Sequence, residues 1–247
     1  MKKDVIPSVR NNISQNPHVV ILGAGASFAA FPKGDKFGRQ LPLMNSLVDT
    51  LGLSKDLNSY KTLFGDFEKL YGTICKNESD QQLRMIIEEK TYEYFYEMEI
   101  VDTPTLYDYL ILSLRKKDII ATFNWDPLLL QALRRHAKFQ DYLPQILFMH
   151  GNVAVGYCES CNLPGYNYNV RCRHCHKPYK PLQLLYPIEK KDYNSDKFIK
   201  EQWDHLTYAL KQAYFITIFG YSAPTTDVEA RKLILDSIKA NRSRAFS

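Results

Sequence analysis

Four short, continuously apolar runs restrict the fold of this chain more than any other feature. They are HVVIL (18–22), DIIATFN (118–124), QILFMH (145–150) and YFITIFG (214–220). Strands buried on both faces of a parallel sheet have this uninterrupted character, whereas strands with one solvated face alternate. Segments with apolar residues at helical spacing separate the runs. We therefore predict an α/β fold: a Rossmann-like parallel sheet with helices on both faces.

The helical pattern also predicts how the chain is organised. Most of 41–117 has apolar residues at helical spacing, and we interpret this region as an insertion between two strands of the sheet. Its clearest helical segments are 41–52, 80–99 and 103–117. Later helices are expected at 126–136, 195–213 and 225–241. We predict one domain over 1–247, with these parts: a Rossmann-like part (15–40, 118–156 and 181–247), a helical insertion (41–117) and a small module (157–180) whose two Cys-x-x-Cys pairs indicate zinc binding.

Composition narrows the class of protein. A hydrophobic content of 45% suffices for a real core, and the net charge of +5 permits attraction to nucleotides or nucleic acid without requiring it. The sequence has no run of eighteen apolar residues, so no membrane span is expected. The basic start, MKKDVIPSVRNNISQNPH, has no apolar core of a secretory signal. The expected location is the cytoplasm.

Four of the five cysteines form two Cys-x-x-Cys pairs, Cys158 with Cys161 and Cys172 with Cys175. Such pairs in a chain without an export signal favour a metal over disulfides. Four thiolates close a tetrahedral zinc to water, so the site is expected to be structural rather than catalytic. The fifth, Cys75, reads as a buried or half-buried thiol.

Each predicted strand ends in a feature that can be read in two ways. GAGAS (23–27) can let the backbone approach a phosphate, but Phe28 breaks the ordinary dinucleotide fingerprint. Asn124 and Asp126 can meet a ligand, or Asp126 can cap the next helix. His150 can be a base or a core histidine. FGYSAPTTD (219–227) can line a site or form a turn capped by Thr225, Thr226 or Asp227.

The order of these features resembles the sirtuin family. GAGAS, TFNWD (122–126), MHG (149–151), the two cysteine pairs and GYS (220–222) follow one another as the corresponding motifs do in sirtuins. Between about 19 and 227 the chain is identified as similar to that family, whose members cleave the nicotinamide–ribose bond of NAD. The resemblance also places the zinc module directly after the catalytic histidine.

The resemblance implies roles for named residues. NAD would be the substrate and zinc the structural metal. Asn124, His150 and Asp126 would be catalytic, with His150 as the general base. Asn124 would also contact the nicotinamide ribose, and Asp126 would bind the carboxamide of nicotinamide. The cofactor would also contact the following residues: Gly23, Ala24, Gly25, Ser27, Gly220 and Ser222.

The sequence departs from the protein-deacylating sirtuins at two places. Their glycine turn continues into G-I-P-D-F-R, whereas this chain reads FAAFPKGDKFGRQ (28–40), with Asp35 and Arg39 out of register. YPIEKKDY (186–193) replaces their acyl-substrate segment, and the region looks more like sirtuin-like domains of bacterial defence proteins. The prediction is NAD hydrolysis to ADP-ribose and nicotinamide in anti-phage defence.

Two alternatives stay open. The first is an NAD-dependent protein deacylase, which the intact cysteine set supports. The second is a non-catalytic zinc-ribbon module that binds nucleic acid or protein, with the basic and aromatic residues of the Cys-rich segment as its surface. The defence-type resemblance also allows for a homo-oligomer or a partner protein in a defence complex. The residues behind the second alternative are Arg171, Arg173, His174, His176, Lys177, Lys180, Tyr166, Tyr168 and Tyr179.

Overall fold

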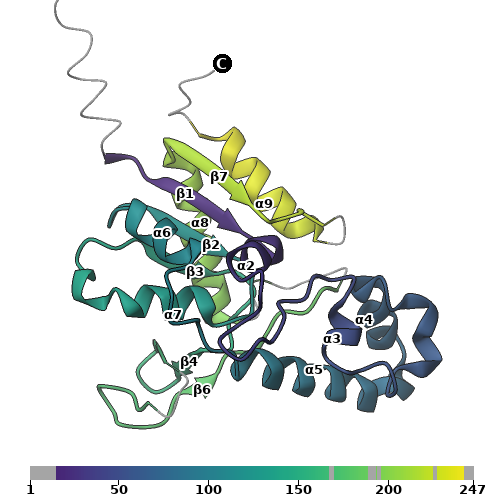
Figure 1. Ribbon diagram of the computed structural model, residues 1–247. Coiled ribbons are helices and arrows are strands. Elements are labelled where there is room, and N and C mark those ends of the chain that lie inside the picture. The colour runs from purple at the N-terminus through teal and green to yellow at the C-terminus, as the bar shows by residue number, and fades with distance from the viewer. Residues whose placement is uncertain (1–14, 167–169, 189–192, 194–195, 225–226, 242–247) are drawn as a thin grey trace, which may run out of the picture.

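The computed structural model describes residues 15–166, 170–188, 193, 196–224 and 227–241. Its main sheet has four parallel strands in the order β3-β2-β1-β7 (Figure 1). The strands are β1 (His18–Leu22), β2 (Ile119–Thr122), β3 (Gln145–Phe148) and β7 (Phe215–Phe219). All four lie inside the apolar runs seen in the sequence, so the predicted Rossmann-like parallel sheet is confirmed.

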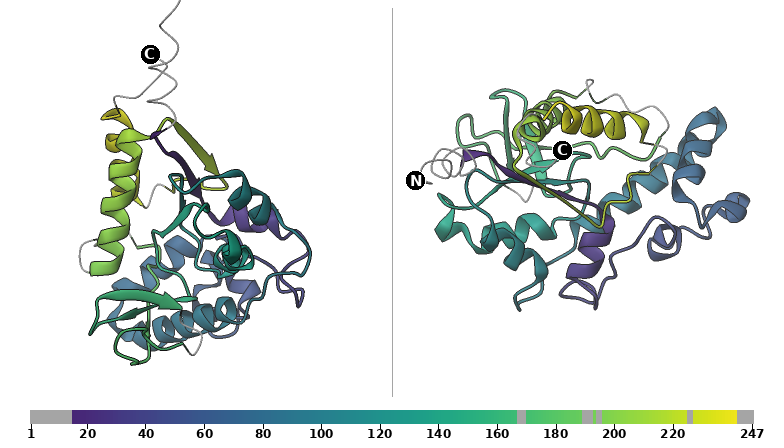
Figure 2. Two further views of the ribbon diagram at one scale, coloured as in Figure 1. Left: turned by 90° about the vertical axis from the view of Figure 1, so that its left-hand side faces the viewer. Right: turned by 90° about the horizontal axis from the view of Figure 1, so that it is seen from above.

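Helices cover both faces of this sheet, as predicted (Figure 2). Side chains that alternate along β1 enter two separate cores, Val20 and Leu22 on one face and Val19 and Ile21 on the other. The first face is covered by α2 (Ala24–Ala30), α6 (Leu106–Ser113) and α7 (Leu128–Arg135). The second is covered by α8 (Lys197–Gln212) and α9 (Val228–Lys239). The continuous apolar character of the strands follows from this burial on both faces.

A helical lobe extends from the sheet at the right of Figure 1. It contains α3 (Leu47–Thr50), η1 (Asn58–Leu63), α4 (Phe67–Lys76), η2 (Glu78–Asp80) and α5 (Gln81–Tyr96). The helix expected over 41–52 is only the single turn of α3. The helix α6, which lies inside the predicted insertion 41–117, packs against α7 and α2 beside the sheet.

The Cys-rich segment forms a second sheet that sequence reasoning did not predict. Its three antiparallel strands have the order β5-β4-β6, with β4 at Val155–Cys158, β5 at Leu163–Tyr166 and β6 at Lys180–Pro181. The short helix η3 (Ala137–Phe139) follows α7 on the main domain. Throughout the described ranges, none of the helices combines the length and apolar character needed to cross a bilayer.

The order in which the chain adds strands to the main sheet reverses at β1, and a crevice is expected at this point. The chain runs from β1 outward through β2 to β3, while β7 lies on the opposite side of β1. Ligands of open α/β sheets bind at such switch points, outside the carboxyl ends of the strands. The ends of β1 and β7 touch there through their backbones: Gly25 N donates to the carbonyl oxygen of Gly220 at 3.0 Å.

This contact needs glycine at Gly220. Its φ is +65°, in the left-handed region, and a Cβ on it would lie 2.0 Å from the backbone nitrogen of Ala26. Gly52 has the same φ of +65° but open space around its Cα. Both glycines therefore need a left-handed φ, but only Gly220 has neighbouring backbone atoms so close that a Cβ would not fit.

We predict that Gly220→Ala lowers the free energy of unfolding by about 3 kcal/mol or more, because strain and a backbone clash add. Gly52→Ala, the matched control, should cost only about 1 kcal/mol from its left-handed φ. Urea unfolding of both variants measures the difference. Equal losses would contradict a tight contact between the β1 and β7 turns.

Candidate functional site

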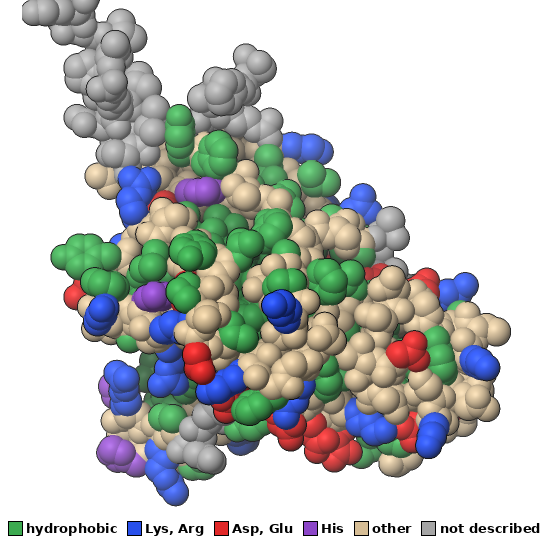
Figure 3. All heavy atoms as spheres, in the orientation of Figure 1, with side chains coloured by type: hydrophobic (Ala, Val, Ile, Leu, Met, Phe, Trp, Pro, Cys, Tyr) green, Lys and Arg blue, Asp and Glu red, His purple; other side chains and the backbone are tan. Residues whose placement is uncertain are grey.

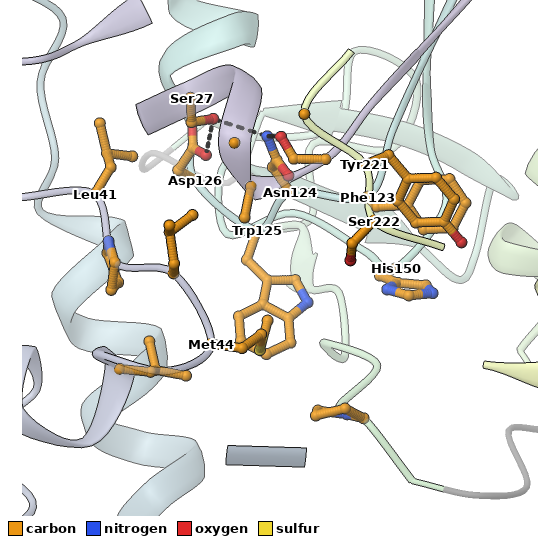
Figure 4. A pocket seen from close by; sticks show the side chains of 18 of the residues that line it. Ser27, Leu41, Met44, Phe123, Asn124, Trp125, Asp126, His150, Tyr221 and Ser222 are labelled. Carbon is orange, nitrogen blue, oxygen red and sulfur yellow. Dashed lines mark hydrogen bonds between the residues drawn. The ribbon is translucent and has the colours of Figure 1, made fainter. Parts of the chain in front are cut away.

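A cavity of about 450 Å³ opens at the carboxyl ends of the four parallel strands (Figure 4). Its size is typical of small-molecule sites. Four strand ends and the helical lobe contribute its walls. The structure brings all the residues predicted for the site to this one cavity: Gly23, Ala24, Gly25, Ser27, Asn124, Asp126, His150, Gly220 and Ser222.

The glycine turn after β1 is held by β7 as well as by its own helix. Gly23 N donates to the carbonyl oxygen of Phe219 at 3.2 Å, and a Cβ on Gly23 would lie 2.6 Å from the carbonyl oxygen of Gly220. The glycines are therefore required by the packing of two strand ends. Strand packing alone explains these glycines, so their contact with the NAD phosphates remains a prediction.

Asn124, Ser27 and Asp126 form a buried hydrogen-bonded network on one wall of the cavity (Figure 4). The Nδ2 of Asn124 donates to Ser27 Oγ at 2.8 Å and to the carbonyl oxygen of Gly23 at 3.0 Å. Ser27 Oγ donates in turn to Asp126 Oδ2 at 2.7 Å. Tyr107 adds its hydroxyl 2.6 Å from Ser27 Oγ.

The network fixes the orientation of the Asn124 amide. The N–H of Gly23 is already bonded to Phe219, so Gly23 offers the amide only its carbonyl oxygen. The amide nitrogen must therefore face Gly23, and Oδ1 must point elsewhere. Among the residues that the structure describes, no donor lies within hydrogen-bonding distance of Oδ1. Asn124 therefore presents a fixed acceptor at the cavity wall.

Asp126 contacts both the start of α7 and the cavity network. Its Oδ1 accepts from the backbone N–H of Leu128 at 3.1 Å, at the start of α7, while Oδ2 accepts from Ser27. Burial raises the pKa of Asp126 above its usual value, and the hydrogen bonds from Ser27 and Leu128 oppose that rise. The N-cap position of α7 is Pro127, so the carboxyl group of Asp126 contacts the start of the helix from the preceding residue and also belongs to the cavity network.

His150 follows β3 and lies at the far end of the cavity from the helical lobe. It is 9% exposed, and its ring meets the edge of Phe123 with centroids 4.8 Å apart. Its Nε2 lies 3.1 Å from Oδ2 of Asp227 and 3.1 Å from the hydroxyl of Tyr193. The ring is therefore held by the contacts of Nε2 with Asp227 and Tyr193 and by aromatic packing against Phe123.

The opposite wall of the cavity is apolar. It comes from the segment before α3, from α3 to α5, and from the segment after β6. Among these, Glu68 of α4 is the acidic exception. The apolar residues are Leu41, Pro42, Leu43, Met44, Leu47, Phe95, Leu185 and Pro187. Trp125 lies between the two walls and packs against Phe95 and Tyr186.

The four cysteines of the second sheet meet in a single cluster. Their sulfur atoms all lie within 4.8 Å of one another. Ligands of a tetrahedral zinc at about 2.3 Å are about 3.8 Å apart, so one ion fits between them.

Hydrogen bonds from the backbone N–H groups of Cys175 and His174 lower the pKa of Cys172 to about 6. Crowding by the other thiols raises the pKa of Cys161 to about 12, so four thiolates would need a cation among them.

The zinc module is joined to the cavity through Asn152. The Nδ2 of this side chain donates to the backbone carbonyl of Asp126 at 2.7 Å, and its Oδ1 accepts from the N–H of Ala154 just before β4. On the other side of the module, the guanidinium of Arg134 lies 3.7 Å from the ring centre of Tyr166. The module therefore lies against the loop that carries Asn124 and Asp126.

Comparisons with known proteins gave structural matches only; no protein-family model and no curated protein matches the chain. A solved structure on the mechanism and regulation of Sir2 enzymes shares 16% identity, covering 95% of this chain and 81% of that one, with a TM-score of 0.47. A Sir2 homologue–NAD complex shares 16%, covering 97% and 81%, with a TM-score of 0.39. A Sir2–p53 peptide–NAD⁺ complex shares 14%, covering 98% and 84%, with a TM-score of 0.37.

In overall fold the chain is similar to Sir2 enzymes. Sir2 enzymes are sirtuins, the family that the order of the sequence motifs resembles. The roles assigned to single residues stay predictions.

Sequence reasoning missed several residues of the site. Asp227 was noticed only as a helix cap, and its pairing with His150 crosses from the start of α9 to the end of β3. Tyr193 and Tyr107 had no local signal, because their partners lie far away in the chain. The alternative caps Thr225 and Thr226, and Tyr168 of the Cys-rich segment, lie outside the described residues.

We predict one zinc ion per chain. Cys172→Ser should release it and lower the melting temperature, because a lobe of three short strands has little core of its own. Cys75→Ser is the control, since Cys75 lies in α4, away from the cluster, and this variant should keep the metal. Elemental analysis gives the stoichiometry. Well-folded parent protein without metal would rule out the site.

Proposed function

We propose that this chain is a sirtuin-like enzyme that cleaves the bond between nicotinamide and ribose in NAD. The observation that carries the proposal is the convergence of the predicted residues, drawn from four strand ends, on one cavity at the switch point of the sheet. Separate turns and caps would have no reason to share a cavity. The sequence motifs and the geometry support the same site.

The net reaction that we favour is hydrolysis. The C1′–N bond of the nicotinamide ribose breaks, and nicotinamide leaves with the bonding electron pair as a neutral ring. Water forms the new C1′–O bond and loses a proton, so NAD⁺ and water give ADP-ribose, nicotinamide and H⁺. In the proposal, Asn124 Oδ1 orients the attacking water or a ribose hydroxyl, and His150 takes the proton.

The folding of the segment after α2 supports hydrolysis over deacylation. Asp35 is buried, and its carboxylate accepts from the backbone N–H groups of Phe37 and Arg39 at 2.9 and 2.8 Å. The side chain of Arg39 binds Glu97 at 2.8 Å. Neither Asp35 nor Arg39 lines the cavity. Both serve the local fold, and neither replaces the D-F-R element that deacylating sirtuins carry.

The non-catalytic alternative rests on the exposed basic face of the zinc module. Arg171, Arg173, His174, His176 and Lys177 are exposed, and Lys180 is paired with Glu159 at 2.7 Å. Lysine, arginine and histidine side chains gather at this lower-left part of the molecule (Figure 3). A steep salt dependence of nucleic-acid binding would support that alternative. The cavity, which this face does not need, is our reason to favour catalysis.

The decisive experiment is incubation of the purified chain with NAD, with and without an acyl-lysine peptide, followed by chromatography of the products. We expect ADP-ribose and nicotinamide in equal amounts without peptide. Turnover that requires the peptide and yields acyl-ADP-ribose would favour the deacylase. As part of the same proposal, the enzyme acts in anti-phage defence through loss of NAD, so an inactive variant should not protect a bacterial host.

The catalytic assignment predicts the effect of single substitutions. Asn124→Ala and His150→Ala should each lower NAD turnover about 10²–10⁴-fold, because a positioned polar group or base is lost. NAD affinity should fall much less. His205→Ala, on α8 and away from the cavity, is the control and should keep parental turnover. A folded His150→Ala protein with parental turnover would remove His150 from the mechanism.

A further inference from the structure

A carboxylate and a tyrosine hydroxyl lie together at one nitrogen of His150. Asp227 Oδ2 is 3.1 Å from His150 Nε2, and the hydroxyl of Tyr193 donates to Asp227 Oδ1 at 2.7 Å. Asp227 is 2% exposed and Tyr193 also 2% exposed. The three side chains come from distant segments: the end of β3, the segment before α8 and the start of α9. Such a buried cluster is expensive to desolvate unless its members are mutually hydrogen-bonded.

The chemistry of the three groups fixes the tautomer of the imidazole. An ionised carboxylate only accepts hydrogen bonds, so the nitrogen beside Asp227 must carry the proton. The hydroxyl of Tyr193 already donates its proton to Asp227, so toward Nε2 of His150 the tyrosine oxygen can only be an acceptor, as the carboxylate is. Burial and the nearby Asp227 raise the pKa of Tyr193, which keeps its proton on the hydroxyl. His150 is thereby held with Nε2–H, and the lone pair lies on Nδ1.

Two aromatic rings pack against the imidazole of His150. Phe123 meets His150 edge to face, at an interplanar angle of 87°. The ring of Tyr193 lies nearly parallel to the imidazole, at 11° with centroids 6.1 Å apart. Figure 4 shows His150 at the margin of the cavity beside Ser222. The ring contacts and the contacts of Nε2 together hold the imidazole at this margin of the cavity.

We propose that Asp227 is a positioning residue that holds His150 in the Nε2–H tautomer, so that Nδ1 acts as the base for the cleavage of NAD. The inference rests on the proposed function for its chemistry, but the tautomer is a property of the free protein. A carboxylate in this position also stabilises the imidazolium that forms when Nδ1 takes up the proton.

Asp227 also caps α9, so a substitution that tests its effect on His150 must keep the cap. Its Oδ1 accepts from the backbone N–H of Ala230 at 3.3 Å, so the same side chain caps α9. Asp227→Ala would remove the cap together with the charge. Asp227→Asn separates them, because asparagine caps helices about as well as aspartate but carries no charge.

The expected results for Asp227→Asn follow from this separation. The variant should melt within a few degrees of the parent and bind NAD within about threefold, while kcat falls about 100-fold or more. An asparagine amide can donate to the imidazole, which the carboxylate cannot, so the histidine should shift toward the Nδ1–H tautomer. Nitrogen-15 NMR of histidine-labelled protein reads the tautomer directly, without any turnover.

Two further variants keep the test sharp. Asp196→Asn is the matched control, since Asp196 caps α8 through Ile199 N at 2.9 Å, and it should leave kcat and the His150 tautomer unchanged. Tyr193→Phe keeps the carboxylate, so it should preserve the Nε2–H tautomer with a smaller loss of kcat than Asp227→Asn. Asp196→Asn thus controls for the loss of a helix-capping carboxylate, and Tyr193→Phe controls for the loss of the hydroxyl, so the effect of the Asp227 charge can be read separately.

The outcomes are distinguishable from failure of the proposed function. A parent protein whose His150 is Nδ1–H, or an Asp227→Asn variant that keeps parental kcat and tautomer, would overturn the inference. A parent with the Nε2–H tautomer that never consumes NAD, even with an acyl-peptide, would overturn the proposed function instead. An Asp227→Asn variant with lost tautomer and parental kcat would show that His150 is held as described but is not the base.

Discussion

The contact between the turns after β1 and β7 is the constraint on which the rest of the site depends. Gly25 donates to Gly220, and the left-handed Gly220 lets the two backbones approach where no Cβ would fit. This contact sets where α2 begins and so where Ser27 lies. Ser27 in turn holds Asn124 and Asp126. The position of the cavity wall thus follows from one backbone approach rather than from the polar side chains themselves.

Part of this arrangement was readable in the sequence because it is local. The strands β1, β2, β3 and β7 fall within the apolar runs, since burial on both faces leaves an unbroken pattern. The residues predicted for the site line one cavity because each lies within about five residues of the carboxyl end of a strand. The helix predicted over 41–52 is wrong for most of its length, because only Leu47–Thr50 is helical. Gly52, with its left-handed φ of +65°, follows the end of this turn.

The parts that were missed depend on contacts between distant segments. The strands β4 and β5, VGYC and LPGY, have no alternation and contain Gly or Pro, so no periodicity marks them. Asp227 carries the local signature of a cap, and nothing near it in the sequence indicates His150. Tyr107 reads as a core residue of α6, although its hydroxyl reaches Ser27. A single sequence records the pattern along the chain but not which segments meet.

The cavity has two walls of different origin, and this has an evolutionary consequence. Its polar wall is built from strand ends that lock one another through hydrogen bonds, whereas its apolar wall is contributed by Leu41, Met44, Phe95 and their neighbours from the helical lobe. Changes in the lobe can reshape the apolar wall without disturbing the polar groups that we propose to be catalytic. A chain organised in this way can diversify in the molecules it accepts while inheriting its reaction unchanged.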